Sequence, residues 1–111
     1  MKSVEAWISP ARLEDITERL RMIGVPGLTV HAIRQPGGPL HVESYRGAVM
    51  TNDLVAKLRL LIVVPDDFAE SVINAVKVVV NRDPDDDGWI IVCPLDEAIR
   101  IRTEERGADA L

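Results

Sequence analysis

The chain has 111 residues, of which 47% are hydrophobic and 28% are charged, and this is the composition of a globular domain. Thirteen lysines and arginines against 18 acids give a net charge of −5, with no basic run and 4% aromatic residues, which argues against a nucleic-acid partner. We expect one domain over residues 1–111.

The first half of the chain predicts a strand, a helix and a second strand. "SVEAWIS" at residues 3–9 alternates apolar and polar side chains, as a half-buried strand does. Over residues 11–23 Leu13, Ile16, Leu20 and Ile23 recur at helical spacing, and Gly24 is a natural helix end. "LTVHAI" at residues 28–33 reads as the next strand.

The second half repeats this order. "KLRLLIVV" at residues 57–64 predicts a third strand, and an apolar stripe over residues 65–80 predicts a second helix. "DPDDDG" at residues 83–88 is a turn by composition, and "WIIVCPL" at residues 89–95 is a fourth strand. The order β-α-β-β-α-β predicts an α+β, ferredoxin-like sandwich with both helices on one face of an antiparallel sheet.

The segment "AIRIRT" at residues 98–103 also alternates. On a strand, Arg100 and Arg102 would share one face, and two guanidinium groups on one face suit a polyanion. The alternative is a pair of surface arginines that form ion pairs with acids such as Glu97 and Glu104. The residues by themselves favour the ion pairs.

A long connection over residues 34–56 separates the second and third strands, where a hairpin normally needs about two to five residues. "QPGGP" within it does not suit a helix or a strand, so we expect the connection to project and to be functional.

Location and redox state follow from other features of the chain. We see no apolar run long enough to cross a bilayer and no leader at the N-terminus, so we expect no membrane insertion. The single cysteine, Cys93, lies in an apolar run, where we expect it to be buried, and it cannot form an internal disulfide. These features predict a cytoplasmic protein.

Five pieces of the chain occur in a characteristic order: "VEAWISPARLEDI", "IGVPGLTV", "YRGA", "IVVPDD" and "EAIRIRTEERGADAL". With them the sequence resembles the PII family of nitrogen-regulatory signalling proteins over nearly its whole length. The resemblance implies a homotrimer with nucleotide sites in the clefts between subunits. It also implies that the long connection, called the T-loop in that family, controls a target enzyme or membrane transporter. Members typically sense ATP against ADP, and many also sense 2-oxoglutarate with Mg²⁺.

The resemblance also assigns residues. Its nucleotide-binding positions are Thr29, Gly37, Val63, Asp87, Gly88, Arg100 and Arg102. Its partner-binding T-loop positions are His41, Tyr45, Arg46, Gly47, Val49 and Met50.

The chain departs from the family pattern in the ligand loops. Asp86 replaces a family glycine and Trp89 replaces a phosphate-binding lysine. The run also holds Asp83, Asp85 and Asp87, and carboxylates near a polyphosphate are repulsive, so ATP or ADP is a candidate ligand of a weakened site. Alternating aspartates suit Ca²⁺ or Mg²⁺, but Pro84 and the missing closing glutamate defeat the EF-hand pattern, so we predict no metal site.

The T-loop departs too. Val49 and Met50 stand where many members have a glutamate and the uridylylated tyrosine, and Ala48 stands where some have a phosphorylated serine. "QPGGPLH" lacks a clear counterpart of the glutamine that helps to hold Mg²⁺ and 2-oxoglutarate, so we do not expect these two to bind. This combination of a kept fold and altered ligand loops resembles that of the divergent PII-like branches of the family. Some of these branches respond to adenine nucleotides or bicarbonate.

Three functions are therefore weighed. The first is a regulator that binds an adenine nucleotide or another anionic effector and acts through the T-loop. The alternative is a trimeric adaptor that has lost nucleotide binding and only docks a partner. The third is an enzyme, which we do not expect, because Cys93, His31 and His41 have no recognisable catalytic partner in the sequence.

Overall fold

The computed structural model describes residues 1–25, 27–36, 42–45, 48–51, 54–83 and 88–111. Its strands are β1 (Lys2–Ile8), β2 (Thr29–Pro36), β3 (Val42–Tyr45), β4 (Ala48–Thr51), β5 (Leu54–Val64) and β6 (Trp89–Pro94). Its helices are α1 (Leu13–Met22) and α2 (Ala69–Val80), and 3-10 turns span Pro10–Arg12, Asp66–Phe68 and Gly107–Ala110. This order contains the predicted β-α-β-β-α-β arrangement.

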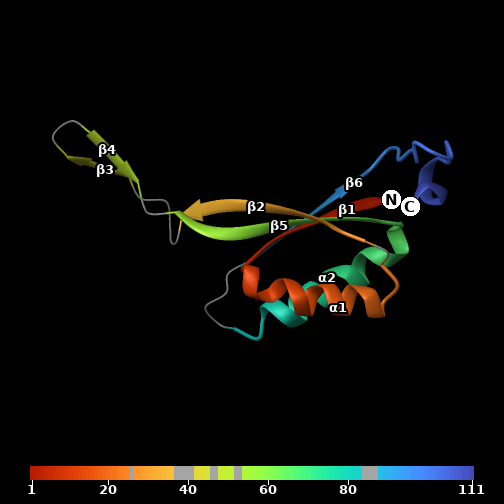
Figure 1. Cartoon of the computed structure of the whole chain (residues 1–111), viewed down its shortest axis with the longest axis horizontal. Helices are drawn as coiled ribbons and strands as arrows, with labels where there is room; N and C mark the ends of the chain where they lie inside the picture. Colours follow the sequence, from red (N-terminus) through yellow and green to blue (C-terminus); the bar gives the residue numbers. More distant parts are fainter. Residues whose placement is uncertain (26, 37–41, 46–47, 52–53, 84–87) are drawn as a thin grey trace.

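Four strands form one antiparallel sheet in the order β2-β5-β1-β6. Figure 1 shows α1 and α2 side by side on one face of this sheet. The other face, called here the open face, carries no α-helix among the described residues, and the C-terminal 3-10 turn Gly107–Ala110 lies on this side, at one end of the sheet. The fold class predicted from the sequence, a ferredoxin-like α+β sandwich, is confirmed.

The core lies between the helices and the sheet. Val4, Ala6 and Ile8 of β1 point to the helices together with Leu60 and Ile62 of β5, and all five are at most 1% exposed. The buried side chains of the helices pack against these residues, and they are Ile16 and Leu20 of α1 and Ala69, Val72, Ala75, Val76, Val79 and Val80 of α2. The alternation that predicted β1 and the apolar stripes that predicted the helices thus mark the buried faces.

Helix α1 ends where the sequence predicted. Gly24 has a φ of +86°, in the left-handed region that favours glycine. The amide of Gly24 donates to the carbonyl of Arg21 and the amide of Val25 donates to that of Leu20, at 3.1 and 3.0 Å. These bonds satisfy carbonyls at the end of the helix and turn the chain back toward the sheet.

The long connection contains structure that the sequence did not predict. β3 and β4 pair as an antiparallel hairpin with Tyr45 opposite Ala48, and they form a sheet separate from the four-stranded one. β2 extends to Pro36 and β5 begins at Leu54, so both strands are longer than predicted. Figure 1 shows the β3–β4 hairpin beyond the far ends of β2 and β5, in agreement with the prediction that this connection projects.

One prediction about the core was wrong. Cys93 is exposed rather than buried, because it lies on β6, the edge strand, opposite Ser3 on the open face. The apolar run around Cys93 forms an edge strand, and among the described residues no α-helix covers the open face of this strand. Among the described residues, no helix is long and apolar enough to cross a membrane.

Candidate functional site

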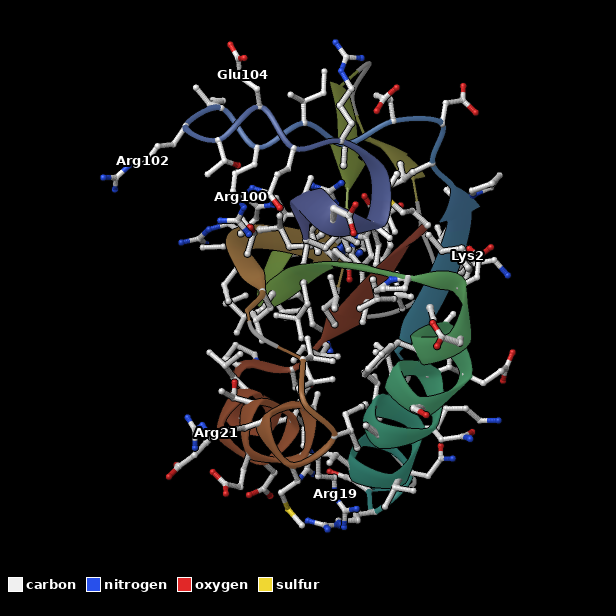
Figure 2. All side chains as sticks on the ribbon, turned by 90° about the vertical axis from the view of Figure 1, so that its right-hand side faces the viewer. Lys2, Arg19, Arg21, Arg100, Arg102 and Glu104 are labelled. Carbon is white, nitrogen blue, oxygen red and sulfur yellow. The ribbon has the colours of Figure 1, made fainter. Side chains whose placement is uncertain are left out.

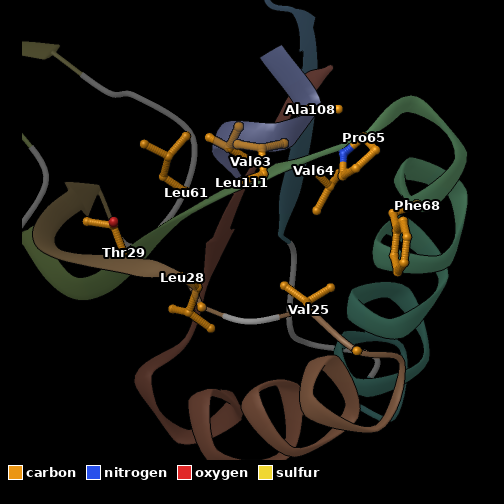
Figure 3. Close-up of a pocket in the computed structure, with 12 residues that line it drawn as sticks. Val25, Leu28, Thr29, Leu61, Val63, Val64, Pro65, Phe68, Ala108 and Leu111 are labelled. Atoms are coloured by element: carbon orange, nitrogen blue, oxygen red, sulfur yellow. The ribbon is translucent and has the colours of Figure 1, made fainter. Parts of the chain in front are cut away.

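A pocket of about 550 Å³, lined mainly by apolar side chains, lies beside the start of β2 and the end of β5. Figure 3 shows it between these two strands, the turn after α1 and the C-terminal end of the chain. Its lining consists of Gly24, Val25, Gly27, Leu28, Thr29, Leu61, Val63, Val64, Pro65, Phe68, Ala108 and Leu111. A pocket of this size, mostly apolar with few polar groups, is typical of a site for the flat apolar part of a small ligand.

Two predicted nucleotide-binding residues meet in this pocket. Thr29 lies directly opposite Leu61 in the β2–β5 register, and Val63 lies two residues further along β5, so all three belong to the same face of the sheet. Thr29 contributes the one side-chain hydroxyl of the described lining, so it is the group that can orient a ligand by hydrogen bonding.

The C-terminal segment closes one side of the pocket. The chain reverses after Ile99, which forms a bridge with Arg106, and the amide of Gly107 donates to the carbonyl of Ala98 at 2.9 Å. This brings Ala108 and Leu111 onto the pocket. No pattern in the sequence indicates this contact, because it depends on the reversal of the chain after Ile99.

The strand conformation that would place Arg100 and Arg102 on one face is not formed over residues 98–103. Ile101, Arg102 and Thr103 form a turn, in which the amide of Glu104 donates to the carbonyl of Arg100 at 2.8 Å and Glu104 has a φ of +61°. Ile101 is 94% exposed, so the alternation of isoleucine and arginine has no apolar face to bury. Alternation alone therefore misled, because no neighbouring strand pairs with this segment in the described part of the chain.

Arg100 and Arg102 are both exposed, and neither lines the 550 Å³ pocket. Figure 2 shows Arg102 at the tip of the C-terminal loop, pointing away from the body of the molecule. Glu97 pairs with Arg106 at 3.6 Å, and the predicted alternative, ion pairs of these two arginines with Glu97 and Glu104, is not formed among the described residues. Among the described residues the two guanidinium groups form no ion pair, so they are available to an anion.

Gly88 has a structural reason to be glycine. A Cβ built on it would lie 2.8 Å from the backbone oxygen of Trp7 and 3.5 Å from Cγ1 of Val80. At Gly88 the backbone therefore approaches β1 so closely that a side chain would force one of them to shift. Asp87 and Gly37, the other predicted backbone positions, lie outside the described residues, as do Asp85 and Asp86.

Some of the predicted partner-binding residues lie in the described strands, and others lie outside the described residues. Tyr45 lies on β3, and Val49 and Met50 lie on β4, one on each side of the hairpin turn. His41, Arg46 and Gly47 lie outside the described residues.

One carboxylate near the pocket has a shifted titration. The N-terminal ammonium lies 2.8 Å from Asp66, directly after Pro65 of the pocket lining. Hydrogen bonding and charge attraction from this ammonium lower the pKa of Asp66 below its ordinary value of 3.8. Among the described residues, no three His, Cys, Asp or Glu side chains gather in a way that could hold a metal ion.

Comparison with known proteins places the chain among regulatory proteins. The family model described as "Nitrogen regulatory protein P-II" matches residues 1–105. The chain is 39% identical to the nitrogen regulatory protein P-II of Cereibacter sphaeroides and 40% identical to that of Rhodospirillum rubrum, and in both comparisons all of each chain is covered.

Two solved structures share the fold. GlnK of B. subtilis superposes with a TM-score of 0.83 at 28% identity, covering 99% of this chain and 97% of GlnK. The PII protein of Arabidopsis thaliana bound to citrate superposes with a TM-score of 0.80 at 34% identity, covering 99% of this chain and 91% of that protein.

Proposed function

The chain belongs to the nitrogen regulatory protein P-II family, a family of signalling regulators, and on that premise we propose that it binds an adenine nucleotide in a cleft between subunits of a homotrimer. The observation that carries this proposal is the pocket on which Thr29 and Val63 meet. Its apolar walls suit a planar base, and the Thr29 hydroxyl suits the polar edge of that base.

A single chain supplies only part of this site. The pocket holds apolar side chains and one hydroxyl, whereas the phosphates of a nucleotide need cations. Arg100 and Arg102 are free of ion pairs within the described residues, but they lie outside the pocket of their own chain. We assign these arginines to the cleft between neighbouring protomers, where they neutralise the phosphates.

The open face of the sheet supports assembly. Trp89 is 65% exposed and Ile91 is 40% exposed, and both lie on the open face of the edge strand β6. An apolar sheet face of this kind is normally covered by another layer, and a second and third copy of the chain provide one.

The β3–β4 hairpin is the segment that we assign to the partner. Among the described residues it pairs with no strand of the main sheet, so a change in its orientation breaks no hydrogen bond of that sheet. We propose that the bound nucleotide orders this segment against a target enzyme or membrane transporter, which requires the nucleotide to bind one arrangement of the segment more tightly than another. We propose a cytoplasmic regulator without catalytic activity of its own.

Calorimetric titration with ATP, ADP and AMP tests the nucleotide site. Replacing both Arg100 and Arg102 by alanine should weaken the binding of ATP or ADP at least tenfold, because hydrogen bonds to charged groups contribute about 1.5–3 kcal/mol each. Arg106→Ala is the matched control, since Arg106 lies in the same loop but pairs with Glu97. Absence of heat and of a thermal shift with all three nucleotides would reject the adenine-nucleotide proposal.

The second candidate is an adaptor that docks a partner without an effector. The acidic run before Gly88 and the exposed indole of Trp89 favour it, because neither attracts phosphate. The two candidates differ in one result. A partner captured by the wild type should be released or bound more tightly when ATP or ADP is added if the chain is a regulator, and its binding should be unchanged by nucleotide if the chain is an adaptor.

A further inference from the structure

Three polar side chains form a connected group on the open face of the sheet. In the strand registers His31 of β2 lies directly opposite Arg59 of β5, and Glu5 of β1 lies opposite Leu61, two residues further along β5. Directly opposite residues share a face, and diagonal neighbours stay within reach of a long side chain. One guanidinium nitrogen of Arg59 lies 3.1 Å from Nδ1 of His31, and the other donates a hydrogen bond to Glu5. We call His31, Arg59 and Glu5 the open-face triad.

The contact with Arg59 fixes the protonation state of His31. A guanidinium group has only donors and stays charged, so the Nδ1 atom that faces it has to accept the hydrogen bond. An imidazole accepts at Nδ1 only when it is neutral and carries its proton at Nε2. The bonded geometry therefore belongs to neutral His31, and protonation would leave two positively charged donors 3.1 Å apart.

Protonation of His31 also changes the net charge of the triad. With a neutral imidazole the cation of Arg59 is balanced by Glu5, and these two side chains are partly buried, at 31% and 19% exposure. With a protonated imidazole the triad carries one uncompensated positive charge. Burial of an unpaired charge is costly, so covering the open face with another chain favours neutral His31.

The surroundings of the triad do not offset the extra charge. Among the described residues no acid forms an ion pair with His31. Lys57, the diagonal neighbour of His31 on β5, is a cation, and its ammonium donates to the hydroxyl of Ser9 at 3.1 Å. The C-terminal 3-10 turn on this side of the sheet carries Asp109, which is exposed and unpaired within the described part of the chain. Protonated His31 would therefore stay uncompensated on this face.

We propose that His31 is a pH switch of assembly: its protonation breaks the contact with Arg59 and weakens the packing of further copies of the chain on the open face. The switch depends on the proposed assembly through that face. Histidine side chains change charge between about pH 5 and 8, which includes the physiological range. Because the separated chain binds the proton more tightly than the assembly does, dissociation increases as the pH falls through this range.

The overall charge of the chain favours the opposite trend. Its net charge is −5 at pH 7 and its isoelectric point is about 4.9, so acidification reduces the repulsion between copies. Overall charge would therefore strengthen assembly as the pH falls, whereas His31 weakens it. The sign of the pH effect separates these two causes.

Subunit exchange measures the switch. Tagged and untagged copies of the full chain are assembled separately and mixed, and the mixed trimers are counted over time. In the wild type we expect exchange to be about tenfold faster or more near pH 5.5 than near pH 7.5, since each unit of difference in pKa between two states corresponds to a factor of ten. His31→Lys carries a permanent charge, so it should exchange fast at both pH values.

His31→Asn is the variant that separates the proton from the side chain. Its amide oxygen can accept from Arg59 in place of Nδ1 and does not titrate, so its exchange should be slow at both pH values. His31 is exposed on an edge strand, so this variant should fold. The chain contains two histidines, and His41→Asn is the matched control that should keep the pH dependence of the wild type.

Faster exchange at the lower pH that His31→Asn removes and His41→Asn keeps supports the switch. Equal exchange rates of the wild type at the two pH values overturn the switch and leave the proposed assembly intact. A pH dependence that His31→Asn keeps, or fast exchange of His31→Asn at both pH values, also overturns it, because the proton on His31 is then not the cause. A protein that sediments as a single chain at both pH values contradicts the assembly and the switch together.

Discussion

Gly88→Ala should destabilise the fold even though it adds one methyl group to an exposed loop. The new Cβ would lie 2.8 Å from the backbone oxygen of Trp7, a separation at which either β1 or the start of β6 has to move. Overpacking of this kind costs about 1–3 kcal/mol. The same substitution also restricts the unfolded chain, which returns about 0.4–1 kcal/mol where the folded backbone tolerates alanine.

Gly27→Ala is the matched control, since nothing lies within 4 Å of its built Cβ. It shares the unfolded-state term but lacks the clash, so the two variants should differ by about 2 kcal/mol in the free energy of unfolding. Urea titration at equal protein concentration measures this difference, because the stability of an oligomer depends on concentration. Equal stabilities of the two variants would refute the reasoning, and Gly88 would then be free for a role in ligand binding alone.

Three further predictions concern the core, the open face and the N-terminus. Leu60→Ala should lower the free energy of unfolding, measured by urea titration, by about 2–5 kcal/mol, because Leu60 is 0% exposed. Met22, which is 77% exposed, is the control, and Met22→Ala should change this free energy by less than about 0.5 kcal/mol. Similar losses in the two variants would contradict the assigned core. Arg59→Leu should lower the free energy of unfolding by about 1.5–3 kcal/mol, because it leaves Glu5 without its hydrogen bond from Arg59. It should also change the tryptophan emission relative to the wild type, because it removes the guanidinium that lies over the Trp7 ring. Unchanged emission would argue against the contact between Arg59 and Trp7. The pKa of Asp66 is lowered in the folded chain, so its contribution to stability is present above pH 3.8 and is lost as the pH falls below that value. The difference in the free energy of unfolding between wild type and Asp66→Asn should therefore shrink below pH 3.8. A difference independent of pH would contradict the pairing of Asp66 with the N-terminus.

The sequence predicted the elements that bury one face. β1, α1 and α2 were recognisable because the apolar residues of each element recur at the period of that element. One residue of each set, Val4, Ile16 and Val72 respectively, is 0% exposed. β2 and β5 were placed correctly but drawn too short, because their outer ends, such as Val55, are exposed and carry no burial pattern.

The errors fell where burial within one chain does not decide the structure. Ile101 alternates with arginines as in a strand, yet it lies in a turn at 94% exposure, and Cys93 lies in an apolar run but on an open edge. Both residues belong to an apolar pattern, yet neither side chain is buried in the single chain. An assembly that covers the open face would explain the pattern around Cys93.

The site was predictable only in part. Thr29 and Val63 came from resemblance and do meet in the pocket, whereas Leu111 and Phe68 were missed, because their place on it depends on the reversal of the C-terminal segment and on the 3-10 turn before α2.

Sedimentation equilibrium of the purified protein tests the central claim most directly, because a nucleotide cleft that needs arginines from a neighbour cannot exist in an isolated chain. The proposed assembly predicts a mass of about 37 kDa, three times the 12.3 kDa of one chain, at micromolar concentration. A species of 12.3 kDa under the same conditions would contradict the proposal that Arg100 and Arg102 complete a site between subunits.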